Sequence, residues 1–213
     1  MEITRRDFIK TSLAASLATA VPGNLGLHAG GTDAIRIGMI GCGGRATGAA
    51  LDCLEAAPGV EVVAMFDLFR DRLEGSLKEL EEKFPGKIKV PADRRYTGFD
   101  GYKALCALPE VNLIVTATPP GFRPVHFRAA IEAGKHVFME KPVAVDPAGV
   151  RSIIATSELA RTKGLAVVAG TQRRHQSRYL EVMKRIHDGA IGELVGGACY
   201  WNQGALWVVK RAP

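Results

Sequence analysis

Short apolar runs alternate with stretches of helical periodicity along most of the chain, starting at Ala34. The apolar runs occupy residues 35–40, 60–66, 88–90, 111–118, 135–140 and 165–172. Runs of this length predict strands that are buried on both faces, and their alternation with helices is typical of βαβ units. The pattern therefore predicts an α/β fold built on a parallel sheet.

The helical stretches carry their own start and stop signals. One helix has apolar residues at spacings of four, three and four and ends at a Pro-Gly pair; the apolar residues are Leu73, Leu77, Leu80 and Phe84. This spacing predicts an amphipathic helix. Further helices are predicted over residues 46–57, 101–107, 125–133 and 179–188.

One more helix is predicted to start at Pro147, with Asp146 as its N-cap. The apolar spacing places Val150, Ile153 and Ile154 on its inward face. After the last helix, residues 192–209 are apolar and aromatic, and they are predicted to form a strand that begins a second domain.

The first apolar run ends in a glycine-rich turn, residues 41–44, followed by an Ala-rich helix. Gly41, Gly43 and Ala46 match the dinucleotide fingerprint G-x-G-x-x-G/A. Glycines let the backbone turn sharply and approach a ligand, and the N–H groups of the next helix attract phosphate. An ordinary tight turn explains the glycines alone equally well.

A carboxylate at the end of the second run favours the nucleotide interpretation. Asp67 lies 24 residues after Gly43, close to the roughly 20 expected for the acid that binds the adenosine ribose. A carboxylate there repels a 2′-phosphate and so favours NAD over NADP, although Arg70 and Arg72 lie near enough to offset the repulsion. The alternative is an Asp that caps the next helix.

Composition fits an ordinary soluble globular protein, with 47% hydrophobic and 23% charged residues. The formal net charge is +6. The basic residues are scattered, apart from Arg94-Arg95 and a cluster of Arg173, Arg174 and Arg178, and aromatic residues do not alternate with them. A nucleic-acid partner is therefore not expected.

The four cysteines are far apart in the sequence and form no C-x-x-C pair. Neither a zinc site nor a disulfide framework is predicted, and no metal is expected. Cys42, Cys53, Cys106 and Cys199 are all interpreted as small core residues.

Residues 4–10, TRRDFIK, precede a mildly apolar stretch and resemble a twin-arginine export signal. The stretch is too short and too rich in Ala, Ser and Thr to span a membrane stably. This resemblance implies export to the periplasm with no other membrane anchor. A mobile basic N-terminus is the alternative.

The chain resembles the Gfo/Idh/MocA family of oxidoreductases from residue 35 to about residue 209, a region that includes the glycine turn. The resemblance depends on IGCGGRATGAA, on Asp67, on the segment TATPPGFRPVHFRAAIEAGKHVFMEKP with its His126, and on AGTQRRH. It implies a Rossmann-type, doubly wound sheet, an NAD or NADP cofactor and a carbohydrate or cyclitol substrate. It also implies a homo-oligomer for the full-length protein.

In that family the lysine of Glu-Lys-Pro lies beside the nicotinamide and orients or polarises the reacting hydroxyl, so the resemblance assigns this catalytic role to Lys141. An ammonium there stabilises the developing carbonyl charge. Glu140 is expected to brace the loop, and His126 to be structural. The residues predicted to bind the cofactor are Gly41, Cys42, Gly43, Gly44, Arg45, Asp67, Thr118, Pro119, Glu140 and Lys141. Those predicted to contact substrate are Gln172, Arg173 and His175.

Three regions follow from this reading: a signal and linker (1–31), a dinucleotide-binding domain (32–172), and the start of a truncated C-terminal α/β domain (173–213). Family members carry an Asp-x-x-x-His type pair on that second domain, and the sequence lacks it in that context. We therefore expect either a fragment or a protein that has lost its acid/base pair.

Two other functions stay open at this stage. One is a non-catalytic dinucleotide-binding fragment or sensor. The other is NAD-dependent glycoside cleavage, which some relatives perform, although that branch replaces Glu-Lys-Pro with other residues and Lys141 argues against it.

Overall fold

The computed structural model describes residues 34–204 and divides into two compact units, Met1–Gly170 and Thr171–Pro213. The predicted export signal and the end of the predicted last strand lie outside the described residues. No helix between residues 34 and 204 combines the length and apolar character needed to cross a bilayer.

The first unit contains one sheet of six strands, and every neighbouring pair runs parallel. The strand order is β3-β2-β1-β4-β5-β6. The strands are β1 (Ile35–Ile40), β2 (Val60–Phe66), β3 (Arg95–Tyr96), β4 (Leu113–Thr116), β5 (His136–Met139) and β6 (Val167–Ala169). The chain moves outward from β1 to β3, then returns beside β1 and moves out the other way. This is the predicted Rossmann-type, doubly wound order.

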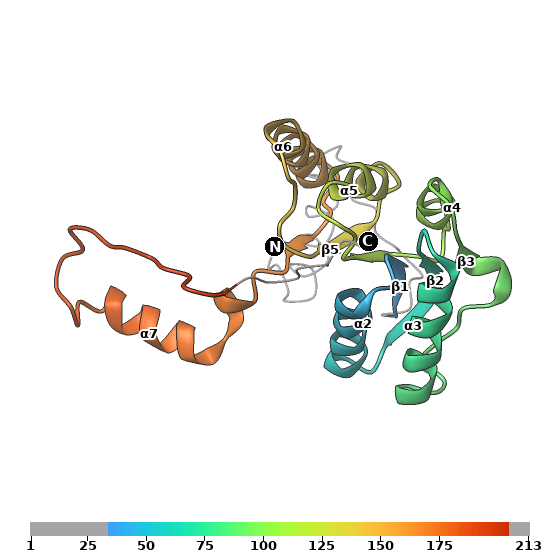
Figure 1. Cartoon of the computed structure of the whole chain (residues 1–213), viewed down its shortest axis with the longest axis horizontal. Helices are drawn as coiled ribbons and strands as arrows, with labels where there is room; N and C mark the ends of the chain where they lie inside the picture. The colour runs from blue at the N-terminus through green and yellow to red at the C-terminus, as the bar shows by residue number, and fades with distance from the viewer. Residues whose placement is uncertain (1–33, 205–213) are drawn as a thin grey trace, which may run out of the picture. The chain divides into compact units, whose positions relative to one another are not determined.

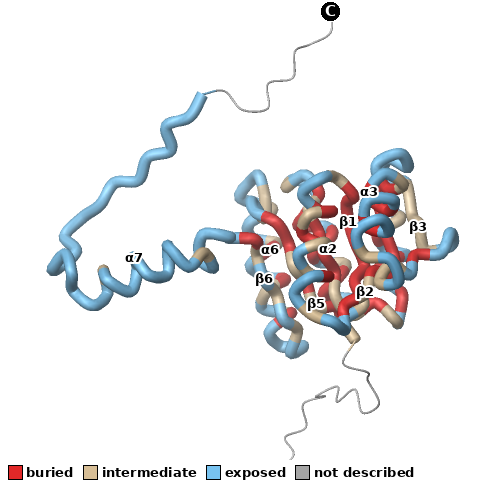
Figure 2. The backbone as a smooth tube through the Cα atoms, turned by 90° about the horizontal axis from the view of Figure 1, so that it is seen from below, coloured by how far each residue is buried: buried red, intermediate tan, exposed pale blue. Residues whose placement is uncertain are grey.

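Helices cover both faces of the sheet (Figure 1). The helices of the first unit are α2 (Gly44–Ala56), α3 (Arg70–Lys83), the short η1 (Ala92–Arg94), α4 (Gly101–Cys106), α5 (Arg123–Glu132) and α6 (Pro147–Thr162). Helices α2 and α3 pack with Ile37 and Met39 in one apolar core, while α4, α5 and α6 form the other core with Ile40 and Ile114. The two cores make the middle strands the most buried part of the unit (Figure 2).

Several predicted boundary signals are confirmed. Leu73, Leu77 and Leu80 of α3 are buried. The Asp146 carboxylate accepts the Gly149 amide at 2.6 Å and caps α6. Gly134, after α5, has φ +74, a left-handed conformation that suits glycine at a helix end.

Some sequence predictions are wrong. Residues 88–90 form no strand: only Ile88 makes an isolated bridge to Val62, and the third strand is β3. On α6, Ile153 is buried, but Val150 and Ile154 are 44% and 60% exposed, because Thr156 and Ala160 occupy the packed side instead. Cys199 is exposed rather than part of a core.

The second unit contains η2 (Gln172–His175) and α7 (Ser177–His187). Residues 193–204 form neither helix nor strand, so the strand predicted over 192–209 is not found in its described part. A strand needs backbone hydrogen bonds to a neighbouring strand, and within the described part of its own unit this segment makes none.

Candidate functional site

Loops from four neighbouring strands leave the sheet at one edge. Ile40 pairs with Phe66 of β2 and with Thr116 of β4, and Thr116 pairs with Met139 of β5. The residues that follow these strands, Gly41 among them, therefore start in one row at the carboxyl edge. Since neighbouring strands lie about 4.8 Å apart, the ends of β1 and β5 are separated by about 10 Å. This edge, where the strand order reverses between β1 and β4, is where open α/β sheets bind ligands.

The glycine turn, residues 41–44, has one glycine that the fold requires and two that it does not. Gly41 has φ +90, and a Cβ there would lie 2.9 Å from Thr118 Cγ2. By contrast, a Cβ at Gly43 would meet only Arg72 Nη1, at 3.9 Å, and a Cβ at Gly44 would meet nothing within 4 Å. The protein itself leaves the space in front of Gly43 and Gly44 open, which fits a ligand that approaches the backbone there.

Helix α2 starts at this open space. Its N-cap Gly43 supplies no side-chain hydrogen bond, and its first turn contains no acidic residue. The first N–H groups of a helix lack internal partners and lie at the positive end of the helix dipole. The start of α2 therefore fits a diphosphate group.

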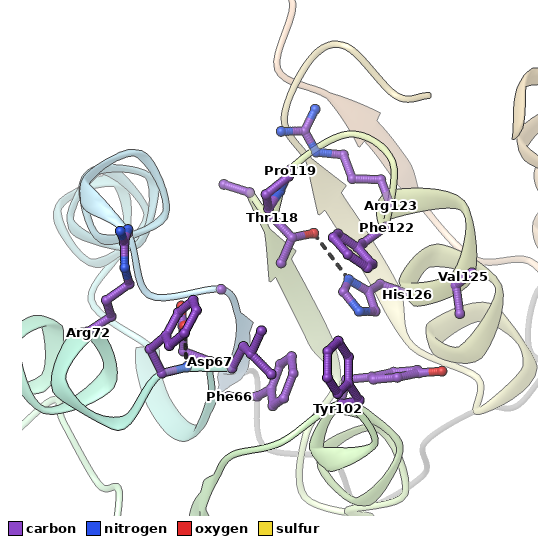
Figure 3. A pocket seen from close by; sticks show the side chains of 16 residues that line it. Phe66, Asp67, Arg72, Tyr102, Thr118, Pro119, Phe122, Arg123, Val125 and His126 are labelled. Atoms are coloured by element: carbon purple, nitrogen blue, oxygen red, sulfur yellow. Dashed lines mark hydrogen bonds between the residues drawn. The ribbon is translucent and has the colours of Figure 1, made fainter. Parts of the chain in front are cut away.

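Asp67 follows β2 and connects two loops. Its Oδ2 accepts the Cys42 amide at 2.7 Å and its Oδ1 accepts the Phe69 amide at 2.9 Å. The residue is 9% exposed and lines the cavity described below (Figure 3). Because each carboxylate oxygen can accept more than one hydrogen bond, Asp67 retains capacity for ligand hydroxyls.

The Cys42 side chain has no reactive role at this site. Its thiol is buried and lies 3.4 Å from the Phe66 carbonyl oxygen, to which it donates. Burial, and then the charge of Asp67, raise the pKa of the Cys42 thiol well above its usual range. The thiol stays protonated, and only the amide of Cys42 contributes a contact to the site.

A cavity of about 600 Å³ opens between Asp67 and α5. This volume is within the range of small-molecule sites. Figure 3 shows aromatic side chains from the end of β2, from α4 and from the start of α5 gathered around it. Its aromatic lining residues are Phe66, Phe69, Phe99, Tyr102, Phe122 and His126. The sequence predicted Gly41, Gly43, Asp67, Thr118 and Pro119 as site residues here but missed most of the aromatic wall.

His126 is a buried, neutral part of the cavity wall. Its Nδ1 lies 3.1 Å from Thr118 Oγ1, and its ring packs 4.6 Å from the Tyr102 ring. Burial lowers the pKa of His126 to about 4. The imidazole is thus uncharged at neutral pH and holds Thr118 in place, which fits the structural role expected from the sequence.

The lysine turn, residues 140–142, follows β5. Glu140 is 5% exposed; its Oε1 accepts from Arg45 Nε at 2.7 Å, and its Oε2 accepts the Lys141 amide at 3.1 Å. Lys141 itself is exposed, and the peptide bond before Pro142 is cis. Glu140 therefore braces the loop, as its sequence context predicts.

Arg123, which sequence reasoning missed, holds the same turn from the cavity side. It is 5% exposed and lines the cavity, and its Nη1 donates to the backbone oxygens of Glu140, at 2.7 Å, and of Pro142. Burial lowers the pKa of Arg123 and Glu140 partly offsets this. Its position three residues after the Pro-Pro pair that follows β4 is the sequence signal that could have identified it.

The cavity does not include every predicted site residue. Cys42, Gly44, Arg45, Glu140 and Lys141 are outside its lining, although they lie at the same edge of the sheet. Gln172, Arg173 and His175 form the exposed η2 of the second unit, so their contact with substrate stays a prediction. No cluster of three or more metal-binding side chains occurs among residues 34–204.

Two family models match the chain. The model described as "Oxidoreductase family, NAD-binding Rossmann fold" covers residues 35–171, and the model of the twin-arginine translocation signal covers residues 2–22. The first match includes the whole sheet and all the cofactor-binding residues predicted from the sequence.

Curated proteins and solved structures resemble the chain over about three quarters of its length. A glycosyl hydrolase family 109 protein of Streptomyces niveus is 31% identical over 169 residues, 79% of this chain and 32% of that protein. The crystal structure of myo-inositol 2-dehydrogenase from Lactobacillus plantarum has a TM-score of 0.61 at 25% identity, covering 76% of this chain and 43% of that one. A 3-ketoreductase from Actinomadura kijaniata, in complex with NADP and TDP-benzene, has a TM-score of 0.58 at 29% identity, with 76% and 44% covered. The chain spans less than half the length of these proteins.

Proposed function

The chain belongs to the Gfo/Idh/MocA family of NAD-binding oxidoreductases, and from this premise we propose that it is the cofactor-binding part of an exported enzyme that transfers hydride at a sugar or cyclitol hydroxyl. One observation carries the proposal. The open glycine turn, the Asp67 carboxylate and the lysine turn all leave the same edge of the sheet, as a single dinucleotide requires.

Each group has a separate task in this proposal. The start of α2 binds the diphosphate, and Asp67 accepts hydrogen bonds from the adenosine ribose. The bound nicotinamide supplies the hydride acceptor or donor. The ammonium of Lys141 stabilises the negative charge that develops on the substrate oxygen and helps its proton to leave.

We further propose that NAD is preferred over NADP. The Asp67 carboxylate faces the cavity and repels a 2′-phosphate. Of the two nearby arginines, Arg70 pairs with Glu74 at 3.4 Å and is not part of the cavity lining, whereas Arg72 lines the cavity. Arg72 alone offsets the repulsion, so the preference is moderate.

The match to a twin-arginine signal supports export of the folded protein, with the periplasm as the proposed compartment. A small carbohydrate is the proposed partner, with no nucleic acid. The full-length protein is proposed to be a homo-oligomer. Lys141 and the predicted substrate contacts Gln172, Arg173 and His175 belong to this proposal.

A second candidate function is NAD-dependent glycoside cleavage. The glycosyl hydrolase family 109 names of several relatives favour it. The Glu-Lys-Pro lysine turn favours the oxidoreductase. A dinucleotide-binding sensor without turnover is the third possibility.

Nicotinamide fluorescence during titration of the purified chain with NADH and NADPH tests the proposal. We expect both to bind, NADH more tightly. NAD+ reduction is then followed with a panel of sugars and cyclitols, and aryl-glycoside cleavage is followed with and without NAD+. The matched variant Lys141→Met should bind NADH normally but lose turnover. Failure of both dinucleotides to bind would contradict the proposal. Binding without turnover by the 213-residue chain would favour either the sensor or a fragment that lacks its acid/base pair.

A further inference from the structure

A chain of three residues connects the glycine turn with the lysine turn. Arg45, in the first turn of α2, donates from Nε to Glu140 Oε1 at 2.7 Å. The second oxygen of that carboxylate accepts the Lys141 amide at 3.1 Å. The two turns that the proposed cofactor would bridge are therefore already joined through one buried carboxylate.

Two glycines leave room for this connection. A Cβ at Gly48 would lie 3.4 Å from Arg45 Nη1, so the arginine side chain lies across this position of α2. A Cβ at Gly170 would lie only 2.6 Å from Glu140 Oε1. The Glu140 carboxylate thus occupies a space that exists because residue 170 has no side chain, and this fixes its direction toward Arg45.

The Arg45 end of this connection is half exposed and has N–H donors that the pair with Glu140 does not use. The Glu140 side chain is 7% exposed, whereas that of Arg45 is 55% exposed and uses one of its five N–H donors in this pair. A positive charge in the first turn of a helix is unfavourable unless an anion is near. A diphosphate at the start of α2 would supply a second anion, and the free donors of the guanidinium could bind it while Nε stays with Glu140.

We propose that Arg45 is a positioning residue that couples diphosphate binding at the glycine turn to the order of the lysine turn. The inference rests on the proposed function, because it requires the dinucleotide. Occupation of the diphosphate site restrains the half-exposed Arg45 side chain while its Nε stays on Glu140, so the pair is formed more of the time and the carboxylate holds the Lys141 backbone more firmly. By linkage, an ordered lysine turn raises diphosphate affinity by the same factor.

The coupling proposed for Arg45 differs from the simple bracing that Arg123 provides. The hydrogen bonds of Arg123 to the lysine turn go to backbone oxygens of Glu140 and Pro142; the Glu140 carboxylate interacts with the Arg123 guanidinium through its charge but accepts no hydrogen bond from it. The turn is therefore held from the cavity side with or without ligand, and the contribution of Arg45 changes with ligand.

Residue-resolved amide hydrogen exchange of the 213-residue chain, with and without saturating ADP, tests the coupling. ADP has the diphosphate but no nicotinamide, so it has no group to place beside Lys141. The Cys42 amide, in the glycine turn, reports occupancy. We expect ADP to slow exchange of the Lys141 amide about fivefold or more. In Arg45→Gln and Glu140→Gln, the Lys141 effect should disappear, while the Cys42 amide is still slowed at saturating ADP.

The matched control is Arg72→Gln, which removes one positive charge from the same site but no contact to Glu140 in the structure. It should keep the Lys141 effect at saturation, even if more ADP is needed. The coupling is wrong if ADP slows Cys42 but not Lys141 in the unmodified chain, or if the Lys141 effect persists at full size in Arg45→Gln. If neither ADP nor NADH binds the unmodified chain, the proposed function itself fails.

Discussion

The carboxylate of Asp67 accepts the backbone amide of Cys42 at 2.7 Å, so the residue expected to bind the ribose also holds the glycine turn. Its other oxygen accepts the Phe69 amide at 2.9 Å. One side chain thus fixes two loops and faces the cavity. In the proposed function, this position therefore serves both folding and cofactor recognition.

Asp67→Asn should lower both stability and NADH affinity. The amide side chain offers one acceptor oxygen for two backbone donors, so one buried N–H loses its partner at a cost of about 1–3 kcal/mol. Chemical denaturation measures the stability loss. The ratio of NADH to NADPH affinity should fall in the same variant, because the carboxylate charge is gone; an unchanged ratio would remove Asp67 from the specificity argument.

Gly41→Ala and Gly43→Ala should separate folding from binding. Gly41 has φ +90 and little room beside Thr118, so an alanine there should destabilise the chain by about 2–4 kcal/mol. Gly43 has φ −75 and open space in front of it. The free energy of unfolding of Gly43→Ala should lie within about 0.5 kcal/mol of that of the unmodified chain. NADH affinity should nevertheless fall about tenfold in Gly43→Ala, a loss of about 1.4 kcal/mol. If Gly43→Ala binds NADH as tightly as the unmodified chain, the proposal that the cofactor binds at the glycine turn is wrong.

His126 should make the chain less stable as the pH falls from about 6.5 to about 4. Burial lowers its pKa from 6.5 to about 4, so in this range the unfolded chain binds a proton that the folded chain refuses. Stability is then fully present above pH 6.5 and declines toward pH 4, by roughly 3 kcal/mol in total. Denaturation at a series of pH values measures the slope. In His126→Gln this part of the slope should be missing, and equal slopes would contradict the effect.

Gly170→Ala should displace the Glu140 carboxylate. The new Cβ would overlap Glu140 Oε1 at 2.6 Å and Cδ at 2.8 Å, and overpacking of this kind costs about 1–3 kcal/mol. Adding the same change to Glu140→Ala should cost almost nothing, because the overlapping atoms are gone. A double-mutant cycle by chemical denaturation gives the answer; equal costs in the two backgrounds would show that Gly170 does not accommodate Glu140.

Local sequence signals predicted most of the fold. The buried leucines of α3, the cap at Asp146 and the runs that became β1, β2, β4, β5 and β6 depend on the chemistry of adjacent residues. The third strand was misplaced because residues 88–90 are apolar enough to be a strand, yet Val90 packs in the core while Arg95–Tyr96 pairs with β2. Which segment pairs at a sheet edge depends on contacts between residues far apart in the sequence, which a local pattern does not report.

The site was predictable where one short motif contains it and less so where it is assembled from several loops. Gly41, Asp67 and Thr118 each follow a recognisable strand. The Arg45–Glu140 pair joins residues 95 positions apart, and the aromatic wall brings Phe69, Phe99 and Phe122 together from three loops. Nothing in the spacing of these residues reveals that they meet.

The structural contacts of Asp67, together with its proposed role at the ribose, would restrict how cofactor preference can evolve or be engineered. A substitution there that admits a phosphorylated ribose also loosens the backbone around Cys42, so selection for the new cofactor meets a folding penalty at the first step. Arg72 lines the same cavity and is exposed, so it can change at little structural cost. Lineages that switch cofactor should therefore mutate around residue 72 first and replace the acid only after compensating changes.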